Sequence, residues 1–285
     1  MTVKVLTVGH ACLDVVHYVP TMPTPDIKVP SDRLRVMLGG NAANVASALI
    51  ELGADADLCC VLGSKYDPIT NTILTLARSK NIGLDCCFIE HDSSPISSVM
   101  ILPNGERALT SYQSQSIIDA SCAIPDLDQY DMVHGDSYRL NLIRAAFSKA
   151  HAQRVPTMLD VDKPVDSISD LPTSNFTIFS KEAFDAMHLT VNDLMSLQKY
   201  FNGIVGYTAG PNAIVYADSQ KIYTFQPKTI DNPVNTLGAG DSYRAALIMH
   251  LCYKKDIHTA IKLACNTAYE HILEKTLTTI TGDIN

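Results

Sequence analysis

The stretch NTLGAGD, residues Asn235–Asp241, runs directly into SYRAALIMHL, residues Ser242–Leu251. The second run contains neither proline nor glycine, so the sequence predicts a glycine-rich loop that opens into a buried helix. The first N–H groups of such a helix carry the positive end of its dipole, which suits a phosphate. Asp241 then stands where a carboxylate beside that anion can act as the base for phosphoryl transfer to a hydroxyl. Taken alone, Asp241 is equally well read as an ordinary N-cap.

A second glycine turn opens the stretch GGNAANVASALIELG, residues Gly39–Gly53. Its small and aliphatic residues predict another buried helix, which closes at a glycine suited to the C′ position. Asn41 and Asn44 lie three residues apart, so their amides share the first turn and could hydrogen-bond a polyol. By itself the pattern favours the simpler interpretation, in which Asn41 caps the helix and Asn44 satisfies a backbone group.

Strand and helix patterns alternate through the rest of the chain, which is typical of βαβ units and a parallel sheet. We expect strands at residues 3–8, 57–62, 86–89, 132–134, 157–161, 176–179 and 204–208, a hairpin at 213–216 and 221–225, helices at 69–79 and 140–151, and short helices near Glu182 and Leu194. No repeat or linker divides this pattern. The sequence therefore predicts one domain over residues 1–285.

A small lid of strands is expected outside the main sheet. A strand-like run follows Asp14, four prolines between residues 20 and 30 punctuate the next segment, and a further run lies near residues 33–38. Residues 97–102 and 107–112 are joined by a loop containing Asn-Gly, a strong hairpin signal. The lid segments thus span about 14–38 and 97–113, with Arg107 near the turn. Without context, Arg107 reads as a surface arginine.

Composition excludes several classes of function. The net charge is -8 and the pI is about 5.5, with no basic run, which argues against nucleic acid and anionic membranes as partners. No apolar stretch is long enough to span a bilayer and the N-terminus lacks a signal pattern, so we expect a cytoplasmic protein. The cysteine pairs Cys59-Cys60 and Cys86-Cys87 should point to opposite faces of strands, as in core packing and unlike a zinc site or disulfide frame.

The two glycine-initiated helices, in this order and in a chain of this length, resemble the signatures of the PfkB/ribokinase family of sugar kinases. The late signature is usually Asp-Thr-x-Gly-Ala-Gly-Asp. Within the family the chain is most similar to the ketohexokinase branch, on the segments GGNAAN (39–44), NGER (104–107), VDKP (161–164), FSKE (179–182) and TLGAGD (236–241). The resemblance covers almost the whole chain. It implies a ribokinase-like α/β fold: a three-layer α/β/α sandwich with a mainly parallel central sheet and a small β-sheet lid, which suits a homodimer formed through the lid.

The resemblance also implies residues that bind the acceptor. Those that would hold sugar hydroxyls are Asp14, Gly40, Asn41 and Asn44. Arg107 would reach in from the lid near the acceptor or the phosphate.

A second group would handle ATP and the transferred phosphoryl group. Asp241 would take the proton from the acceptor hydroxyl, and the anion hole for the γ-phosphoryl group would be formed by Gly238, Ala239 and Gly240. Thr208 and Gly210 would border ATP, with Mg²⁺ bridging its phosphates.

Three positions depart from the family pattern. Asn235 stands where relatives usually have Asp beside a monovalent-cation site, which puts potassium activation in doubt. Ser180-Lys181-Glu182 replaces the usual Asn-x-x-Glu, a motif tied to magnesium and phosphate, and leaves Glu182 as the metal candidate. The turn at residues 208–213 lacks a later family glycine, so nucleotide contacts there can differ.

These features favour an ATP-dependent kinase that phosphorylates a primary hydroxyl of a ketohexose-like monosaccharide. Two alternatives remain open. One is a non-catalytic or slow relative that binds a sugar or a nucleotide, and the other is a kinase of the same type for a nucleoside or another sugar.

Overall fold

A nine-stranded sheet forms the centre of the molecule in the computed structural model, which describes residues 2–231, 236 and 238–281. Its strands are parallel except at one edge, where β12 and β13 run antiparallel to their neighbours. In spatial order they are β13 (Ile222–Phe225), β12 (Ile214–Ala217), β11 (Ile204–Thr208), β10 (Phe176–Ser180), β9 (Thr157–Val161), β8 (Met132–Asp136), β1 (Lys4–Gly9), β4 (Asp55–Leu62) and β5 (Gly83–Phe88).

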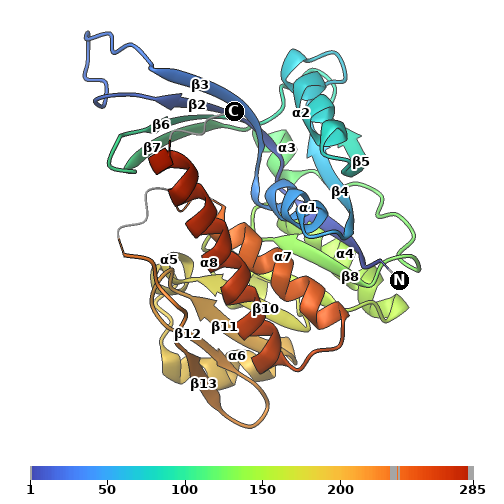
Figure 1. The fold of residues 1–285 in the computed structure, drawn as a ribbon. Coiled ribbons are helices and arrows are strands. Elements are labelled where there is room, and N and C mark those ends of the chain that lie inside the picture. The colour runs from blue at the N-terminus through green and yellow to red at the C-terminus, as the bar shows by residue number, and fades with distance from the viewer. Residues whose placement is uncertain (1, 232–235, 237, 282–285) are drawn as a thin grey trace.

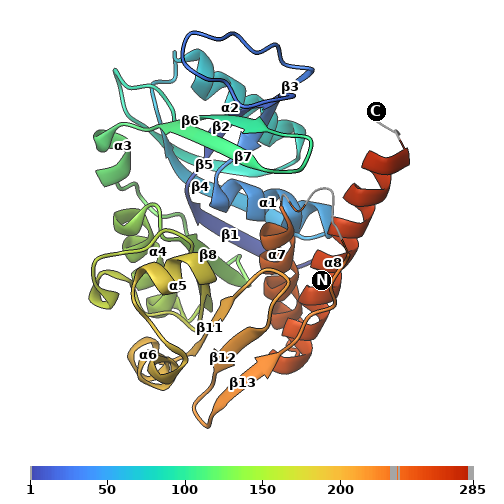
Figure 2. The ribbon, with the colours of Figure 1, turned by 90° about the vertical axis from the view of Figure 1, so that its left-hand side faces the viewer.

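Helices cover both faces of this sheet, and each face has its own buried cluster of apolar side chains (Figures 1 and 2). On one face lie α1 (Asn41–Glu51), α2 (Pro68–Ser79), α7 (Ala239–Cys252) and α8 (Ile257–Thr281). On the other lie α3 (Gln115–Asp119), α4 (Leu140–Gln153), α5 (Lys181–Ala186) and α6 (Leu194–Phe201). Cys59 and Cys60 of β4 belong to opposite clusters, as their adjacent positions on a strand require. This arrangement confirms the predicted α/β sandwich.

The predicted small sheet is also present and stands apart from the main one (Figure 1). Its strand order is β3 (Arg33–Gly39), β2 (Cys12–Tyr18), β6 (Ile96–Ile101) and β7 (Arg107–Tyr112). We call these four strands the lid sheet. The lid sheet leaves large apolar side chains open to solvent: Leu34, Val36, Leu109 and Tyr112.

The main sheet reverses its winding between β1 and β8. From β1 the order continues through β4 and β5 on one side, whereas β8 and the later strands lie on the other. Parallel sheets bind ligands at such a switch point, at the carboxyl ends of the strands. Asp136 ends β8 there, and its buried carboxylate accepts the backbone N–H groups of His10 at 2.8 Å, Ala42 at 3.0 Å and Tyr138 at 3.0 Å. One side chain therefore joins the end of β1, the start of α1 and the end of β8.

Three elements differ from the sequence prediction. The helices α3 and α8 were not predicted, and β5 begins at Gly83 where the pattern suggested residue 86. Asp85 interrupts the apolar run of β5 and hides its start. None of the described helices is both long and apolar enough to cross a membrane.

Candidate functional site

The two glycine-initiated helices begin side by side at the switch point. Helix α1 packs against α7 (Figure 2). The Asn44 side chain, in the first turn of α1, interacts with the carboxyl of Asp241, in the first turn of α7, and favours its ionised form. The structure thus joins two stretches that lie almost 200 residues apart in the sequence.

The turn before α1 needs both of its glycines. Gly40 is the N-cap with φ 95°, and a Cβ atom there would lie 2.4 Å from the His10 carbonyl oxygen. A Cβ atom on Gly39 would lie 2.2 Å from a carboxylate oxygen of Asp14 on β2. The absence of side chains therefore lets Asp14, to which the family resemblance assigns acceptor binding, approach the start of α1. Burial raises the pKa of Asp14.

Neither helix start is capped in the way that the simpler interpretations suggested. The N-cap of α1 is Gly40 and that of α7 is Gly238, and neither makes a side-chain cap bond. Asn41 instead donates from Nδ2 to Asp162 Oδ2 at 3.1 Å. Asp241 is the third residue of α7. Both polar side chains are therefore turned to the site and not to their own helix ends.

The start of α7 offers backbone N–H groups to an anion. Gly238 adopts the left-handed conformation, with φ 81°. The Ala239 N–H already bonds the Thr236 carbonyl oxygen at 3.2 Å. The predicted anion hole, at Gly238, Ala239 and Gly240, thus lies at the N-terminal end of α7.

Asp241 is placed as a base would be. Its side chain is 20% exposed. Burial raises the pKa of its carboxyl, and the charge of Asp162 adds to this rise, whereas Arg244 and the hydrogen bond from Asn44 oppose it. A carboxylate with a raised pKa accepts a proton more readily than a fully solvated one.

Three charged residues that line this site, Asp160, Asp162 and Arg244, had no predicted role. Arg244 of α7 lies between Asp160, at the end of β9, and Asp162, which follows it. All three leave a signal in the sequence. An arginine interrupts an otherwise aliphatic helix, and two aspartates alternate with valine at the end of an apolar strand.

The residues assigned to the nucleotide lie further along the same edge of the sheet. Thr208 ends β11 directly beside Ser180, which ends β10. Gly210 has φ 55° with open space where a side chain would be. Ser180 caps α5 by accepting the Ala183 N–H at 3.2 Å. Glu182, in the first turn of α5, is exposed.

One predicted site residue, Arg107, is not brought into the cluster. It is exposed at the first position of β7, and among the described residues its side chain makes no hydrogen bond or ion pair. Asn235 lies outside the described residues.

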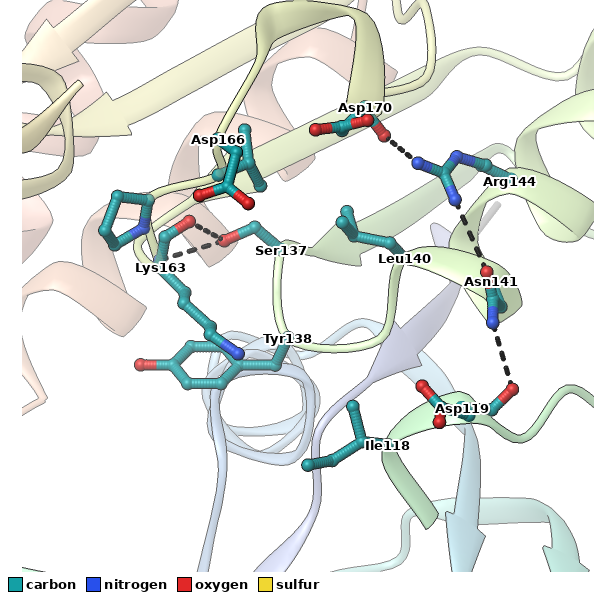
Figure 3. Close-up of a pocket in the computed structure, with 12 residues that line it drawn as sticks. Ile118, Asp119, Ser137, Tyr138, Leu140, Asn141, Arg144, Lys163, Asp166 and Asp170 are labelled. Atoms are coloured by element: carbon teal, nitrogen blue, oxygen red, sulfur yellow. Dashed lines mark hydrogen bonds between the residues drawn. The ribbon is translucent and has the colours of Figure 1, made fainter. Parts of the chain in front are cut away.

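A polar cavity of about 360 Å³ lies beside the site, between the start of α4 and the loop after β9 (Figure 3). Tyr138 and Lys163 form its inner wall, and the Lys163 side chain extends toward the Tyr138 ring. Tyr138 follows Asp136 by two residues, and Lys163 directly follows Asp162. Arg144 and Asp170 lie on the opposite side and are joined by a hydrogen bond from Nη2 to a carbonyl oxygen at 2.5 Å.

Comparison with known proteins agrees with this geometry. Ketohexokinase of Mus musculus is 24% identical over 298 residues, covering 93% of this chain and 94% of that protein. A nucleoside kinase of Methanocaldococcus jannaschii is 21% identical over 254 residues, covering 86% and 82%. A crystal structure from Agrobacterium tumefaciens, named provisionally as a ribokinase, superposes with a TM-score of 0.85 at 24% identity, covering 94% and 90%.

The family comparison extends over nearly the whole chain. Residues 2–281 match the pfkB family of carbohydrate kinases, whose members are ATP-dependent phosphotransferases. Both glycine-initiated helices and the lid sheet fall inside the match. This protein belongs to the pfkB family of carbohydrate kinases.

Proposed function

We propose that this protein transfers the γ-phosphoryl group of ATP to a primary hydroxyl of a ketohexose-like monosaccharide, with Asp241 as the general base. The observation that carries the proposal is the packing of α1 against α7, which brings the Asn44 side chain to the Asp241 carboxyl. It puts an amide suited to sugar hydroxyls against the group that would deprotonate one of them. Similarity to ketohexokinase supports the choice of sugar class.

The proposed reaction is a single in-line transfer. The acceptor oxygen forms a bond to the γ-phosphorus while its proton passes to an Asp241 oxygen. The bond between that phosphorus and the bridging oxygen breaks, and ADP leaves with the electron pair. The backbone at Gly238, Ala239 and Gly240 would stabilise the charge on the transferring group, which is the main task in phosphoryl transfer.

The acceptor would lie between β2 and the first turn of α1. Asp14 offers a carboxylate held against Gly39. Asn41 retains its amide oxygen as an acceptor, since its Nδ2 is bonded to Asp162. Asn44 and the Gly40 backbone complete this side. Arg107 would have to move with the lid to reach the phosphate.

Mg²⁺ would be held mainly by the nucleotide. Among the described residues no group of three or more His, Cys, Asp or Glu side chains is arranged to bind a metal ion. That fits Mg²⁺, which proteins usually hold through one or two carboxylates together with substrate phosphates. Glu182 is the carboxylate that we assign to this role, and Thr208 and Gly210 would border the nucleotide. ATP as the phosphoryl donor is consistent with the cytoplasmic location expected from the sequence.

A panel of acceptors tests the proposal. ADP release would be measured with Mg²⁺ and ATP for ketohexoses, aldoses and nucleosides, with and without potassium. We expect the highest kcat/KM for a ketohexose. Binding of sugars without turnover of any acceptor would refute the kinase assignment and favour the binding protein considered above.

The nucleoside arm of the panel is needed because a specific feature favours that alternative. The cavity beside Tyr138 could accommodate a base, and the Tyr138 ring offers it a stacking surface. A nucleoside kinase is also among the relatives. A higher kcat/KM for a nucleoside than for any sugar would select this second function.

We also propose that the lid sheet forms a homodimer through its open apolar face. Leu34 is 57% exposed and Val36 is 45% exposed, and the two lie on the same face of β3; exposed apolar faces of this kind favour association. The double substitution Leu34→Glu and Val36→Glu should therefore convert dimer to monomer in sedimentation velocity. Tyr66→Glu, at a side chain 94% exposed outside the lid sheet, is the matched control. A wild-type protein that sediments as a monomer at all concentrations would disprove the dimer.

A further inference from the structure

Arg244 touches three carboxyl groups from two parts of the site. Its side chain is 9% exposed. Nε lies 2.6 Å from Asp160 Oδ2, Nη2 lies 3.7 Å from Asp162 Oδ1 and Nη1 lies 3.9 Å from Asp241 Oδ1. One guanidinium group therefore connects the end of β9 with the first turn of α7.

The glycine turn of α7 makes room for this guanidinium. A Cβ atom on Gly240 would lie 2.6 Å from Arg244 Nη1. The guanidinium therefore lies directly against the turn that is assigned to the transferring phosphoryl group. Because Asp160 is fully buried on the strand behind it, the closest ion pair fixes the other end of the planar fork.

The contacts of Arg244 extend to the acceptor side of the site. Asp162 contacts Arg244 through Oδ1 and accepts from Asn41 through Oδ2 at 3.1 Å. Asn44, on the same turn of α1 as Asn41, interacts with the Asp241 carboxyl and favours its ionised form. The chain of contacts runs from Asn41 through Asp162 and Arg244 to Asp241 and returns to α1 at Asn44.

The charges around Arg244 favour this arrangement. Burial raises the pKa of Asp160, and the positive charge of Arg244 opposes that rise. The positive charge of Arg244 opposes the rise that burial imposes on the pKa of Asp241. Other titratable groups near the cluster come from each element packed against it, and they are His134, Tyr138, Asp162, Tyr243 and His271.

We propose that Arg244 is a positioning residue for phosphoryl transfer, whose guanidinium holds the Asp241 carboxylate ionised and oriented while it is anchored on Asp160 and Asp162. The inference rests on the proposed function of Asp241 as base. In this role Arg244 itself takes no proton. Its effect is to keep Asp241 able to accept the acceptor's proton on the acid side of the pH range.

The pH profile of kcat tests this role. For Arg244→Gln, the ratio of kcat to the wild-type value should fall about tenfold as the pH is lowered from about 8 to about 5, because an opposite charge at this distance changes carboxyl ionisation by at least about that factor. Arg244→Lys retains the charge and should keep the ratio nearly constant. Arg78→Gln, at an exposed arginine in the last turn of α2, is the control. A ratio for Arg244→Gln that does not change with pH would overturn the proposal.

A double variant separates positioning from folding. Arg244→Gln leaves Asp160 buried without its ion-pair partner, which can unfold a protein. The double variant Arg244→Gln with Asp160→Asn removes both charges of that ion pair. It still leaves Asp241 without its positive neighbour. If Arg244 served only to neutralise Asp160, the double variant would regain the wild-type pH profile. Loss of kcat on the acid side that persists in the double variant supports positioning.

Titration of the Asp241 carboxyl carbon by NMR gives a readout that does not depend on turnover. The resonance would be assigned by its loss in Asp241→Asn. In the double variant it should titrate at higher pH than in the wild-type protein, and an unchanged titration would contradict the inference. If the acceptor panel gives no turnover but the titration shifts, the proposed function fails while the electrostatic role of Arg244 stands.

Discussion

Asp241→Asn is expected to lower kcat by about 10²–10⁴-fold, the usual contribution of a positioned base. The amide that replaces the carboxylate cannot take the acceptor proton. The amide has nearly the same size as the carboxylate and retains an oxygen that can interact with Asn44, so the fold should persist. Steady-state kinetics with the best acceptor from the panel, together with thermal unfolding, measures both effects.

The matched control for this variant is Asp55→Asn. Asp55 is exposed at the amino end of β4, the end of the sheet opposite to the candidate site. Its substitution should leave kcat within about twofold, as expected for a surface change away from the site. Turnover of Asp241→Asn close to that of the control would rule out Asp241 as the base.

Asp136→Leu is expected to cause the largest loss of stability. The substitution leaves three N–H groups, those of His10, Ala42 and Tyr138, without their acceptor. Each unsatisfied buried group costs about 1–3 kcal/mol, so the loss should be at least about 3 kcal/mol. For a chain of this size that lowers Tm by at least about 6 °C.

Asp136→Asn provides the graded comparison. It has nearly the same shape and keeps one oxygen that can accept some of these N–H groups, so its Tm should lie between those of wild type and Asp136→Leu. Differential scanning calorimetry gives the three values. Equal Tm for wild type and the leucine variant would show that the Asp136 contacts do not stabilise the fold.

The fold could be predicted because its signals are local. The turn at Gly39–Gly40 and the one before α7 each combine glycine with a long run free of proline, and the intervening strands are continuous apolar runs. Such patterns depend on the backbone and on burial of neighbouring residues. The hairpin between β6 and β7 was equally clear, since Asn-Gly favours its turn.

The network behind the base could not be predicted, since it depends on strand order. Asp160 meets Arg244 only because β9 ends opposite the start of α7, and no local pattern in the sequence specifies that pairing. The same holds for Asn41, whose partner Asp162 lies 121 residues away. Local reasoning gave Asn41 and Asp241 capping roles as alternatives because it could not include these distant partners.

The connection of the lid sheet to α1 has a mechanical consequence. Strand β3 ends at Gly39 and α1 begins at Asn41, so only Gly40 separates them. Strand β2 of the same sheet carries Asp14, which rests against Gly39. A hinge motion of the lid sheet therefore cannot occur independently of the acceptor site, because it moves one wall of that site and pivots at the residue before Asn41. Opening of the lid sheet and release of the proposed sugar would therefore occur in one movement.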